Sequence, residues 1–386
     1  MLQPKVIFYS SLDLLYTDYS QSYCKHQHRP GLSLLRDITR FWSSSFVMID
    51  RTGATTNPIN SQILPHLMLP KFETVNDELE GLCDRRAREL LDHAKNTGRR
   101  LAVLYSGGID STLILISLLK VAKPDEIDQL VEVYLSEHSR SENPRFYTDH
   151  LLKNFKNVDS SYKFHNVVGH PNRITVTGEG CDQMFGTNVF LEFTRLYDDS
   201  IMNKSCTETS IKSLISNGSG ATNGLNADVV DKIHEYYRPI INAAPVPIDT
   251  VYKYFWWLNF TLKWQSVYVR LSSYTHPRYR GTLKYEDNYT MFFGPEYFQL
   301  WAMNNSNNLI RDTWSSYKYV CKDIIRKFTH DHEWCDRKMK YGSLVSILKS
   351  KWQARIIDNQ GKFYDEYSDW CFNEDNLLAR LDRQAP

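Results

Sequence analysis

The segment 101–119 constrains the fold more than any other part of the chain. Five strand-forming residues, 101–105, lead directly into the turn SGGIDST at 106–112, and an apolar stretch of helical length follows. Such a strand–turn–helix unit presents backbone N–H groups at the positive end of a helix dipole, where an anion can bind. The sequence therefore predicts an α/β unit with an anion-binding turn after this strand.

The residue types of this turn suit the pyrophosphate part of a nucleotide. The candidate nucleotide-binding residues are Ser106, Gly107, Gly108, Asp110, Ser111 and Thr112. The carboxylate of Asp110 is the kind of ligand that holds the Mg²⁺ accompanying nucleotide phosphates. The turn has neither the lysine of the GxxxxGK[ST] phosphate loop nor the three-glycine spacing of dinucleotide-binding turns. The alternative is a glycine turn with a purely structural role. We disfavour it because hydroxyl and carboxylate residues follow the apolar strand in the register of the motif.

A second turn of the same kind occurs further along the chain. A strand-like run at 173–177 is followed by GEGCDQMFG at 178–186, with Gly178 and Gly180 in the turn and Asp182 at the start of a helix. Taken alone, Asp182 could be an ordinary helix N-cap. Two neighbouring parallel strands, however, would bring Asp110 and Asp182 to the same sheet edge, where they would share a Mg²⁺. Cys181 is either a nucleophile or, as we favour, a small buried residue.

Periodicity predicts the elements around these turns. A helix is expected over 76–97 and another over 144–154, with strands over 130–135, 162–168 and 173–177. Strands alternating with helices are typical of a doubly wound parallel sheet, in which ligands bind beyond the carboxyl ends of the strands.

We expect two domains. Residues 1–75 would form a small N-terminal unit of unknown role, with strand-like runs at 6–9 and 46–49. Residues 76–386 would form the main domain, comprising a core at 76–200, a flexible Ser/Thr/Asn/Gly-rich loop at 201–228, and a mainly helical part at 229–386 that is rich in aromatic residues.

Composition excludes several classes of partner. The 46 Lys and Arg residues nearly balance the 45 Asp and Glu residues, so no overall basic field indicates nucleic acid or an anionic membrane. The seven cysteines are scattered without a Cys-x-x-Cys pair, which favours reduced thiols in the cytoplasm. We find neither a membrane-spanning run nor a signal peptide and expect a cytoplasmic protein. Clusters at 24–28 and 330–335 could supply zinc ligands, but loops are the favoured interpretation.

The two turns, in this order, resemble the synthetase domain of the asparagine synthetase family, which carries SGGxDS and GEGxDExFG. The resemblance extends more loosely over about 76–350 and implies a fold of the ATP pyrophosphatase, or adenine nucleotide alpha hydrolase-like, type. The segment 318–342 ends in RKMKYG, which resembles the family's basic stretch Arg-x-Lys-x-Gly/Gln. The resemblance implies that Lys340 is the lysine that steadies the charge of the reacting intermediate, with Lys338 in the place of the arginine.

The implied activity is an ATP- and Mg²⁺-dependent ligation. A small-molecule or peptide carboxylate would be adenylated with release of pyrophosphate, and the acyl group would pass to ammonia or an amine. Glu179 would orient the substrate or accept a proton from the amine. Alternatives are a tRNA- or nucleotide-modifying ATP pyrophosphatase and a non-catalytic nucleotide-binding scaffold.

Three departures from the family pattern affect the substrates. Leu2 stands where the family's glutaminase has its cysteine nucleophile, so the nitrogen would come from solution or a separate subunit. Gln183 replaces the glutamate after Asp182, and the segment before 178 is shorter than in the synthetases. The identities of the carboxylate and of the nucleophile therefore stay open, as does the oligomeric state.

Overall fold

The computed structural model describes residues 6–9, 30–42, 48–55, 64–160, 164–186, 189–218, 225–280, 285–311, 313–338, 356–358 and 360–364. The chain forms two compact units, each built from segments that are distant in sequence. Unit 1 comprises Met1–Leu69, Gly186–Ser273 and Gln353–Pro386, and unit 2 comprises Pro70–Phe185 and Tyr274–Trp352. These units do not coincide with the consecutive segments 1–75 and 76–386, because Gly186–Ser273 and Gln353–Pro386 group with the N-terminal residues.

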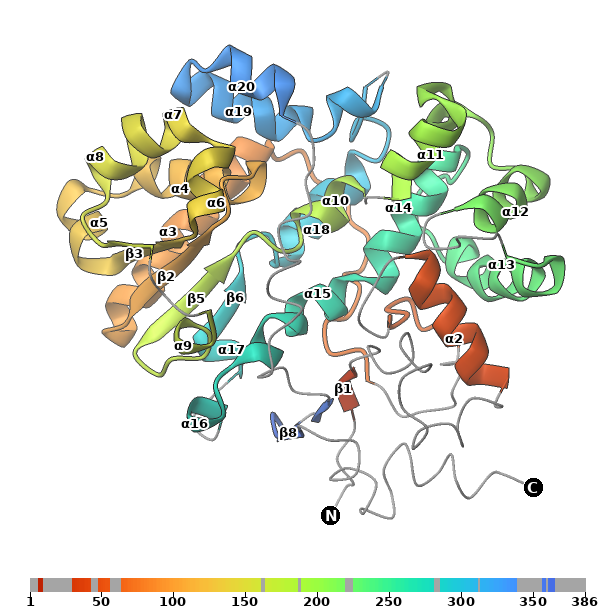
Figure 1. Ribbon diagram of the computed structural model, residues 1–386, viewed down its shortest axis with the longest axis horizontal. Helices are drawn as coiled ribbons and strands as arrows, with labels where there is room; N and C mark the ends of the chain where they lie inside the picture. The colour runs from red at the N-terminus through yellow and green to blue at the C-terminus, as the bar shows by residue number, and fades with distance from the viewer. Residues whose placement is uncertain are drawn as a thin grey trace. The chain divides into compact units, whose positions relative to one another are not determined.

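Unit 2 contains a five-stranded, wholly parallel sheet in the order β4–β3–β2–β5–β6. Figure 1 labels four of these strands, β3, β2, β5 and β6. The strands are β2 (Arg100–Tyr105), β3 (Val131–Leu135), β4 (Val158–Asp159), β5 (Arg173–Thr177) and β6 (Tyr289–Met291). Counted along the chain, the spatial order is 3-2-1-4-5, which is that of a doubly wound sheet. The predicted parallel α/β sheet is thus confirmed.

The helices of unit 2 pack on this sheet and on one another. Helices α3, α4 and α5 contact β2, and α19 contacts both α3 and α4. The α-helices are α3 (Leu79–Thr97), α4 (Ile109–Val121), α5 (Pro124–Leu130), α6 (Glu137–Glu142), α7 (Pro144–Phe146), α8 (Leu152–Asn154), α9 (Phe164–Val167), α10 (Cys181–Phe185), α16 (Pro277–Arg280), α17 (Tyr285–Asn288), α18 (Glu296–Asn304), α19 (Tyr319–Thr329) and α20 (His332–Arg337).

Two predictions for unit 2 have opposite outcomes. The helix expected over 144–154 is confirmed as α7, a π-helical turn at Tyr147–Leu151, and α8. The strand expected over 162–168 is wrong, since its described part contains helix α9, and the edge strand β4 lies earlier. Val167 packs against Ala102 and Tyr134 of the sheet. A short apolar run can form a helix that packs on a sheet, or it can form a further strand of that sheet. Periodicity alone does not distinguish the two cases.

Unit 1 combines a small antiparallel sheet with a helical, aromatic core. Its strands, in the order β1–β7–β8, are β1 (Val6–Tyr9), β7 (Ile356–Asp358) and β8 (Phe363–Tyr364). Its α-helices are α2 (Pro30–Phe41), α11 (Val189–Tyr197), α12 (Glu208–Asn217), α13 (Ala227–Asn242), α14 (Val251–Leu262) and α15 (Trp264–Arg270). Every residue of α14 is buried, and Trp256, Trp257 and Phe260 pack ring against ring.

The structure corrects the prediction of a flexible loop at 201–228. A 3₁₀-helix at Asp199–Asn203 extends into this segment, and α12 lies within it. Thr207 caps α12 by accepting a hydrogen bond from the Ser210 amide (3.2 Å), and Ile211, Leu214 and Ile215 are buried. Three apolar side chains at helical spacing suffice to order a polar segment once a core covers them. Residues 219–224 lie outside the described part.

The N-terminal predictions are met in part. The strand expected at 6–9 is confirmed as β1. At 46–49, Met48 and Ile49 are buried but belong to no strand, and the two residues before them lie outside the described ranges. No helix in the described part of the chain is both long and apolar enough to cross a lipid bilayer.

Candidate active site

The two glycine turns begin side by side. Strands β2 and β5 are direct neighbours, with Leu101 opposite Ile174 and Val103 opposite Val176. The strand order reverses between them, because β3 and β4 lie on the β2 side and β6 lies on the β5 side. This is a topological switch point, and ligands of open α/β sheets bind beyond the carboxyl ends of the strands at such points.

Glycine is required where the turns approach other backbone. Gly107 has φ +78°, and a Cβ there would lie 2.4 Å from the Ser139 carbonyl oxygen. A Cβ on Gly178 would lie 2.8 Å from Cβ of Asp110, so the second turn rests against the start of α4. Gly180 also has a positive φ, +91°, which disfavours other residues. The four predicted turn glycines are thus part of one closely packed structure.

Hydroxyl groups brace the first turn. Oγ of Ser111 accepts a hydrogen bond from the Ser106 amide at 3.1 Å, and the two serine hydroxyls lie 3.1 Å apart. The Gly108 amide in turn donates to Oγ of Ser106 at 3.3 Å. Ser111 and Thr112 are buried, whereas Ser106, Gly108 and Asp110 are only half-buried. The partly open side of the turn therefore carries a hydroxyl, a backbone amide and a carboxylate.

Asp110 and Asp182 converge, and a lysine joins them. Nζ of Lys318 lies 2.5 Å from Oδ1 of Asp110 and 2.6 Å from Oδ1 of Asp182. The hydroxyl of Tyr317 donates to the same Asp182 oxygen at 2.7 Å. Asp110 belongs to the first turn of α4, and Asp182 to that of α10. We call Asp110, Asp182, Lys318 and Tyr317 the carboxylate cluster.

Burial and charge set the protonation states within this cluster. Burial by itself would lower the pKa of Lys318, but Asp110 and Asp182 together raise it well above the usual lysine value. The side chain, only 3 % exposed, is therefore a buried ammonium. Burial and the nearby Asp182 raise the pKa of Tyr317 well above its usual value, so its hydroxyl stays a donor. Two carboxylates therefore face one ammonium in this cluster.

Sequence reasoning missed Lys318 as a functional residue. It lies at the start of the basic segment 318–342, just before α19, but nothing local separates it from Lys322 or Lys327 on that helix. Its backbone is unusual, with φ 55° and ψ 33°, a left-handed conformation uncommon for residues other than glycine. Strained backbone of this kind is concentrated at functional sites. Lys340, the predicted catalytic lysine, lies outside the described residues.

Two further residues of the second turn have different environments. Glu179 is half-buried between Gly178 and Gly180. Cys181 is fully buried, and burial, together with the neighbouring Cys321, raises the pKa of its thiol well above the usual value. A neutral, inaccessible thiol is a poor nucleophile. The buried-packing interpretation of Cys181 therefore has the better support.

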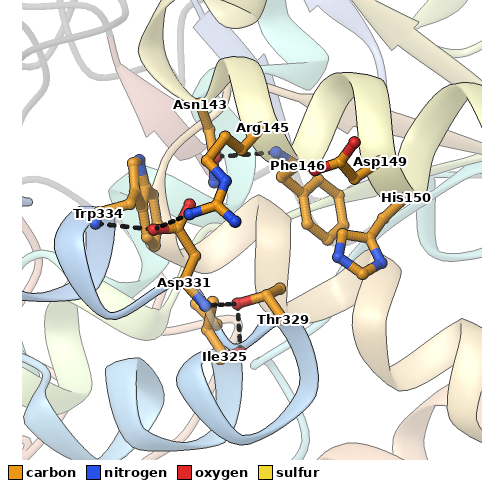
Figure 2. Close-up of a pocket in the computed structure, with 9 residues that line it drawn as sticks. All are labelled: Asn143, Arg145, Phe146, Asp149, His150, Ile325, Thr329, Asp331 and Trp334. Atoms are coloured by element: carbon orange, nitrogen blue, oxygen red, sulfur yellow. Dashed lines mark hydrogen bonds and ion pairs between the residues drawn. The ribbon is translucent and has the colours of Figure 1, made fainter.

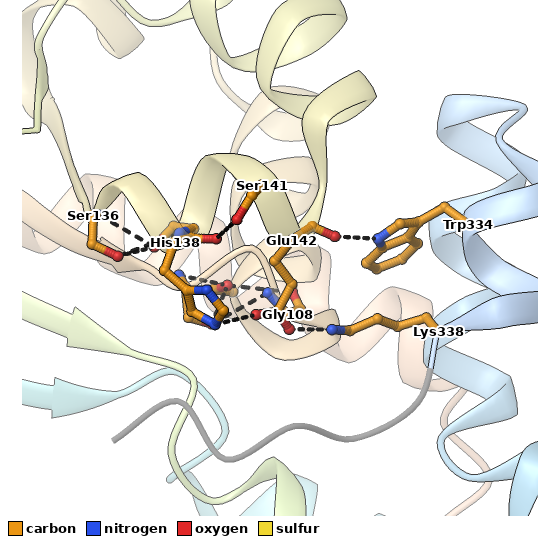
Figure 3. Close-up of polar contacts among 10 residues, drawn as sticks. Gly108, Ser136, His138, Ser141, Glu142, Trp334 and Lys338 are labelled. Atoms are coloured by element: carbon orange, nitrogen blue, oxygen red, sulfur yellow. Dashed lines mark hydrogen bonds and ion pairs between the residues drawn. The ribbon is translucent and has the colours of Figure 1, made fainter. Parts of the chain in front are cut away.

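Lys338 belongs to a second ionic contact. Its Nζ pairs with Oε1 of Glu142, and the two side chains are 6 % and 9 % exposed. The indole of Trp334 donates to the Glu142 backbone carbonyl at 3.0 Å (Figure 3). Cβ of Glu142 would also meet a Cβ placed on Gly107, at 2.9 Å. The Glu142–Lys338 pair thus connects the end of α20 to the first glycine turn through α6.

Glu142 and Lys338 both line a cleft. It has a volume of about 730 Å³ and is lined by residues of α6 and α20 and by the start of α7, including Glu142, Arg145 and Trp334. A separate small pocket of about 10 Å³ lies between α7 and α20, where Arg145 pairs with Asp331 at 3.2 Å (Figure 2). The cleft is of the size that binds small molecules, whereas the pocket is near the minimum for one water.

The donor set fits a nucleotide-bound metal better than an all-protein site. Mg²⁺ usually takes one or two carboxylates together with substrate phosphates and water, and Asp110 and Asp182 are such a pair. Within the described ranges, no group of three or more His, Cys, Asp or Glu side chains is placed to hold a metal. The zinc alternative at 330–335 therefore gains no support, and the cluster at 24–28 lies outside these ranges. The sequence matches no protein-family model and no curated protein.

Proposed function

We propose that the protein is an ATP-dependent, amide-forming ligase of the ATP pyrophosphatase type, with its active site at the carboxyl ends of β2 and β5. The observation that carries the proposal is the convergence of Asp110 and Asp182 on Lys318 between two glycine turns. Carboxylates, one ammonium and turn amides at a switch point form the set of groups that a metal-bound pyrophosphate requires.

The chain's own groups account for ATP binding and activation. Amide and hydroxyl groups of the 106–112 turn would hold the pyrophosphate, at the N-terminus of α4. Asp110 and Asp182 would hold Mg²⁺, which, when bound, adds positive charge next to the phosphates. The ammonium of Lys318, which contacts both carboxylates, would add further positive charge beside the phosphates. Catalysis of this kind depends on positioning and on charge neutralisation.

The proposed reaction has two steps. A carboxylate oxygen of the substrate attacks the α-phosphorus of ATP, the α–β bridging bond breaks, and pyrophosphate leaves with the bonding pair. The amine then attacks the acyl carbon, and AMP leaves as the amide forms. Glu179, between the two turn glycines, is our candidate to take the proton that the amine loses. Lys340 remains our candidate for the charge that develops on the intermediate.

Product analysis tests this proposal. The protein is incubated with ATP, Mg²⁺ and a panel of carboxylates and amines, and the nucleotide products are separated. We expect AMP and pyrophosphate to accumulate only with a productive pair, and not with the Asp182→Asn variant. ADP and inorganic phosphate would contradict the proposal. Stoichiometric ATP binding with no turnover across the panel would favour the scaffold alternative.

A further inference from the structure

We propose that Lys318 is a built-in counter-cation that keeps free divalent metal away from Asp110 and Asp182, so that metal enters only together with a polyphosphate. This inference rests on the proposed function, because it assumes that the two carboxylates serve a metal–nucleotide complex. It adds an order of binding at that site, in which the polyphosphate must be present before the metal can bind.

The position of the ammonium is the first support. Nζ of Lys318 is within 2.6 Å of one oxygen of each carboxylate. A Mg²⁺ ion bridging the same two oxygens would require distances of 2.0–2.1 Å to both. An ammonium and a divalent ion cannot both occupy that position, and a divalent ion next to it would meet strong repulsion at low local dielectric. Metal binding at these two oxygens therefore requires the ammonium to be displaced or compensated.

The second support is that the lysine is held in place. Its side chain is almost completely buried, and its backbone is fixed in the left-handed conformation directly before α19. Nζ lies 5.2 Å from the ring centroid of the adjacent Tyr317, whose hydroxyl contacts Asp182. An exposed lysine would leave the carboxylates at little cost, whereas this one leaves them only if another acceptor replaces them.

A polyphosphate on the first turn would supply that acceptor. Asp110 lies within this turn, two residues after Gly108, and Lys318 contacts its carboxylate. Phosphate oxygens bound there would add negative charge beside the ammonium and give it a new partner. The carboxylate oxygens would then be available to the metal that the polyphosphate brings. Metal and polyphosphate would bind with positive coupling, and such coupling is reciprocal.

Equilibrium dialysis with Mn²⁺ as the metal probe tests the inference on the full chain. Four proteins are compared: wild type, Lys318→Met, Lys318→Gln and a control, Lys327→Met. Lys327 also lies on α19, but it is 74 % exposed and pairs with Glu80 at 3.1 Å, away from the cluster. Each protein is measured with Mn²⁺ alone and with Mn²⁺ plus α,β-methylene-ATP, which cannot be cleaved between the α- and β-phosphates.

We expect both Lys318 variants to bind Mn²⁺ alone at least tenfold more tightly than wild type, and Lys327→Met to match wild type. Adding Asp110→Asn to Lys318→Met should abolish the gain. A Lys318→Met protein that folds only when Mn²⁺ is present would also support the inference, because the metal would then replace the missing charge. The wild type should retain Mn²⁺ together with the nucleotide analogue.

Other outcomes separate this inference from the proposed function. If wild type retains Mn²⁺ with the analogue but the Lys318 variants bind Mn²⁺ alone no better than wild type, the counter-cation role is wrong and the proposed function stands. If wild type binds Mn²⁺ equally well without the analogue, the role is also wrong. If wild type retains no Mn²⁺ with the analogue, the proposed function fails, and the inference fails with it.

Discussion

Lys318 and Lys338, two of the buried lysines of unit 2, differ in the charge around them. Lys318 faces the carboxylates of Asp110 and Asp182, whereas Lys338 pairs with the single carboxylate of Glu142. Both side chains are less than a tenth exposed. Two carboxylates thus face one ammonium in the first set, and one carboxylate faces one ammonium in the second.

We infer from this difference that the first set of groups binds a ligand and that the second connects elements of unit 2. A balanced buried pair holds elements together but offers little to a further ion. Two carboxylates offer oxygen ligands of the kind that Mg²⁺ takes together with substrate phosphates. The Glu142–Lys338 pair also links α20 to the turn that would hold the phosphates. We therefore expect substitutions at the two lysines to affect different properties of the protein.

The largest effect should follow substitution of the aspartates. Asp110→Asn and Asp182→Asn should each lower turnover to AMP by about 10³-fold or more, since each removes a ligand of the same ion. The double variant should have nearly the same turnover as either single variant, because the two residues act as one unit. Asp323→Asn is the matched control, because Asp323 lies on the exposed side of α19 and pairs with Arg311 and Arg326. Losses that multiply in the double variant would show that the two carboxylates serve separate sites.

Removing Lys338 should mainly affect stability. Lys338→Met leaves the buried Glu142 carboxylate without its ammonium, which should lower the free energy of unfolding by about 3 kcal/mol. Glu142→Leu combined with Lys338→Met should recover most of this loss, because no buried charge is then left uncompensated. Urea denaturation measures the free energy of unfolding of the single and the double variant. In the same assay, added Mn²⁺ should stabilise Lys318→Met but not Lys338→Met. Equal stabilisation of both variants by Mn²⁺ would remove the distinction between the two lysines.

Lys340 tests whether a third lysine acts on the chemistry. Lys340→Ala should lower kcat by about 10²-fold, because its charge would matter most as negative charge develops in the reacting intermediate. The ATP concentration for half-maximal rate should change much less. Steady-state kinetics at saturating ATP measures the effect. An unchanged kcat would transfer the role to another cation, with Lys318 as the next candidate.

The smallest effect concerns pH on the Glu142–Lys338 side of unit 2. The ring of His150 lies beside that of Phe146 (Figure 2), with the centroids 5.4 Å apart. The ring centroid of Phe328 is also 5.4 Å away, and burial lowers the pKa of His150. The folded protein therefore favours the neutral imidazole. This contribution is complete above the unfolded pKa of about 6.5 and is lost as pH falls through the lower folded pKa.

The pH effect is measured by urea denaturation at pH 7.5 and pH 5.5. Wild type should lose more stability on acidification than His150→Phe, and the difference should be well below the effect of Lys338→Met. His93→Phe, at an exposed position of α3, is the control and should leave the pH dependence unchanged. An identical pH dependence in wild type and His150→Phe would show that this imidazole does not contribute.

Local sequence was sufficient to predict the centre of the candidate site. Both glycine turns and the parallel strands before them follow from short-range patterns, and parallel pairing then brings Asp110 and Asp182 together. Predictions failed where an apolar run was too short to define its own structure, as at α9, or where tertiary burial ordered a polar segment, as at α12.

The sequence by itself determined the two glycine turns, the strands that precede them and the residues at each turn, because glycine conformation and apolar periodicity act over a few residues. Only the tertiary structure decided which cations meet which carboxylates. Lys318 lies 208 residues from Asp110 along the chain, and Lys338 lies 196 residues from Glu142. Pairing over such distances depends on how α19 and α20 pack on the rest of unit 2. The residues next to each lysine in the sequence do not indicate its partner, because the ion pair depends on which carboxylate the fold brings close.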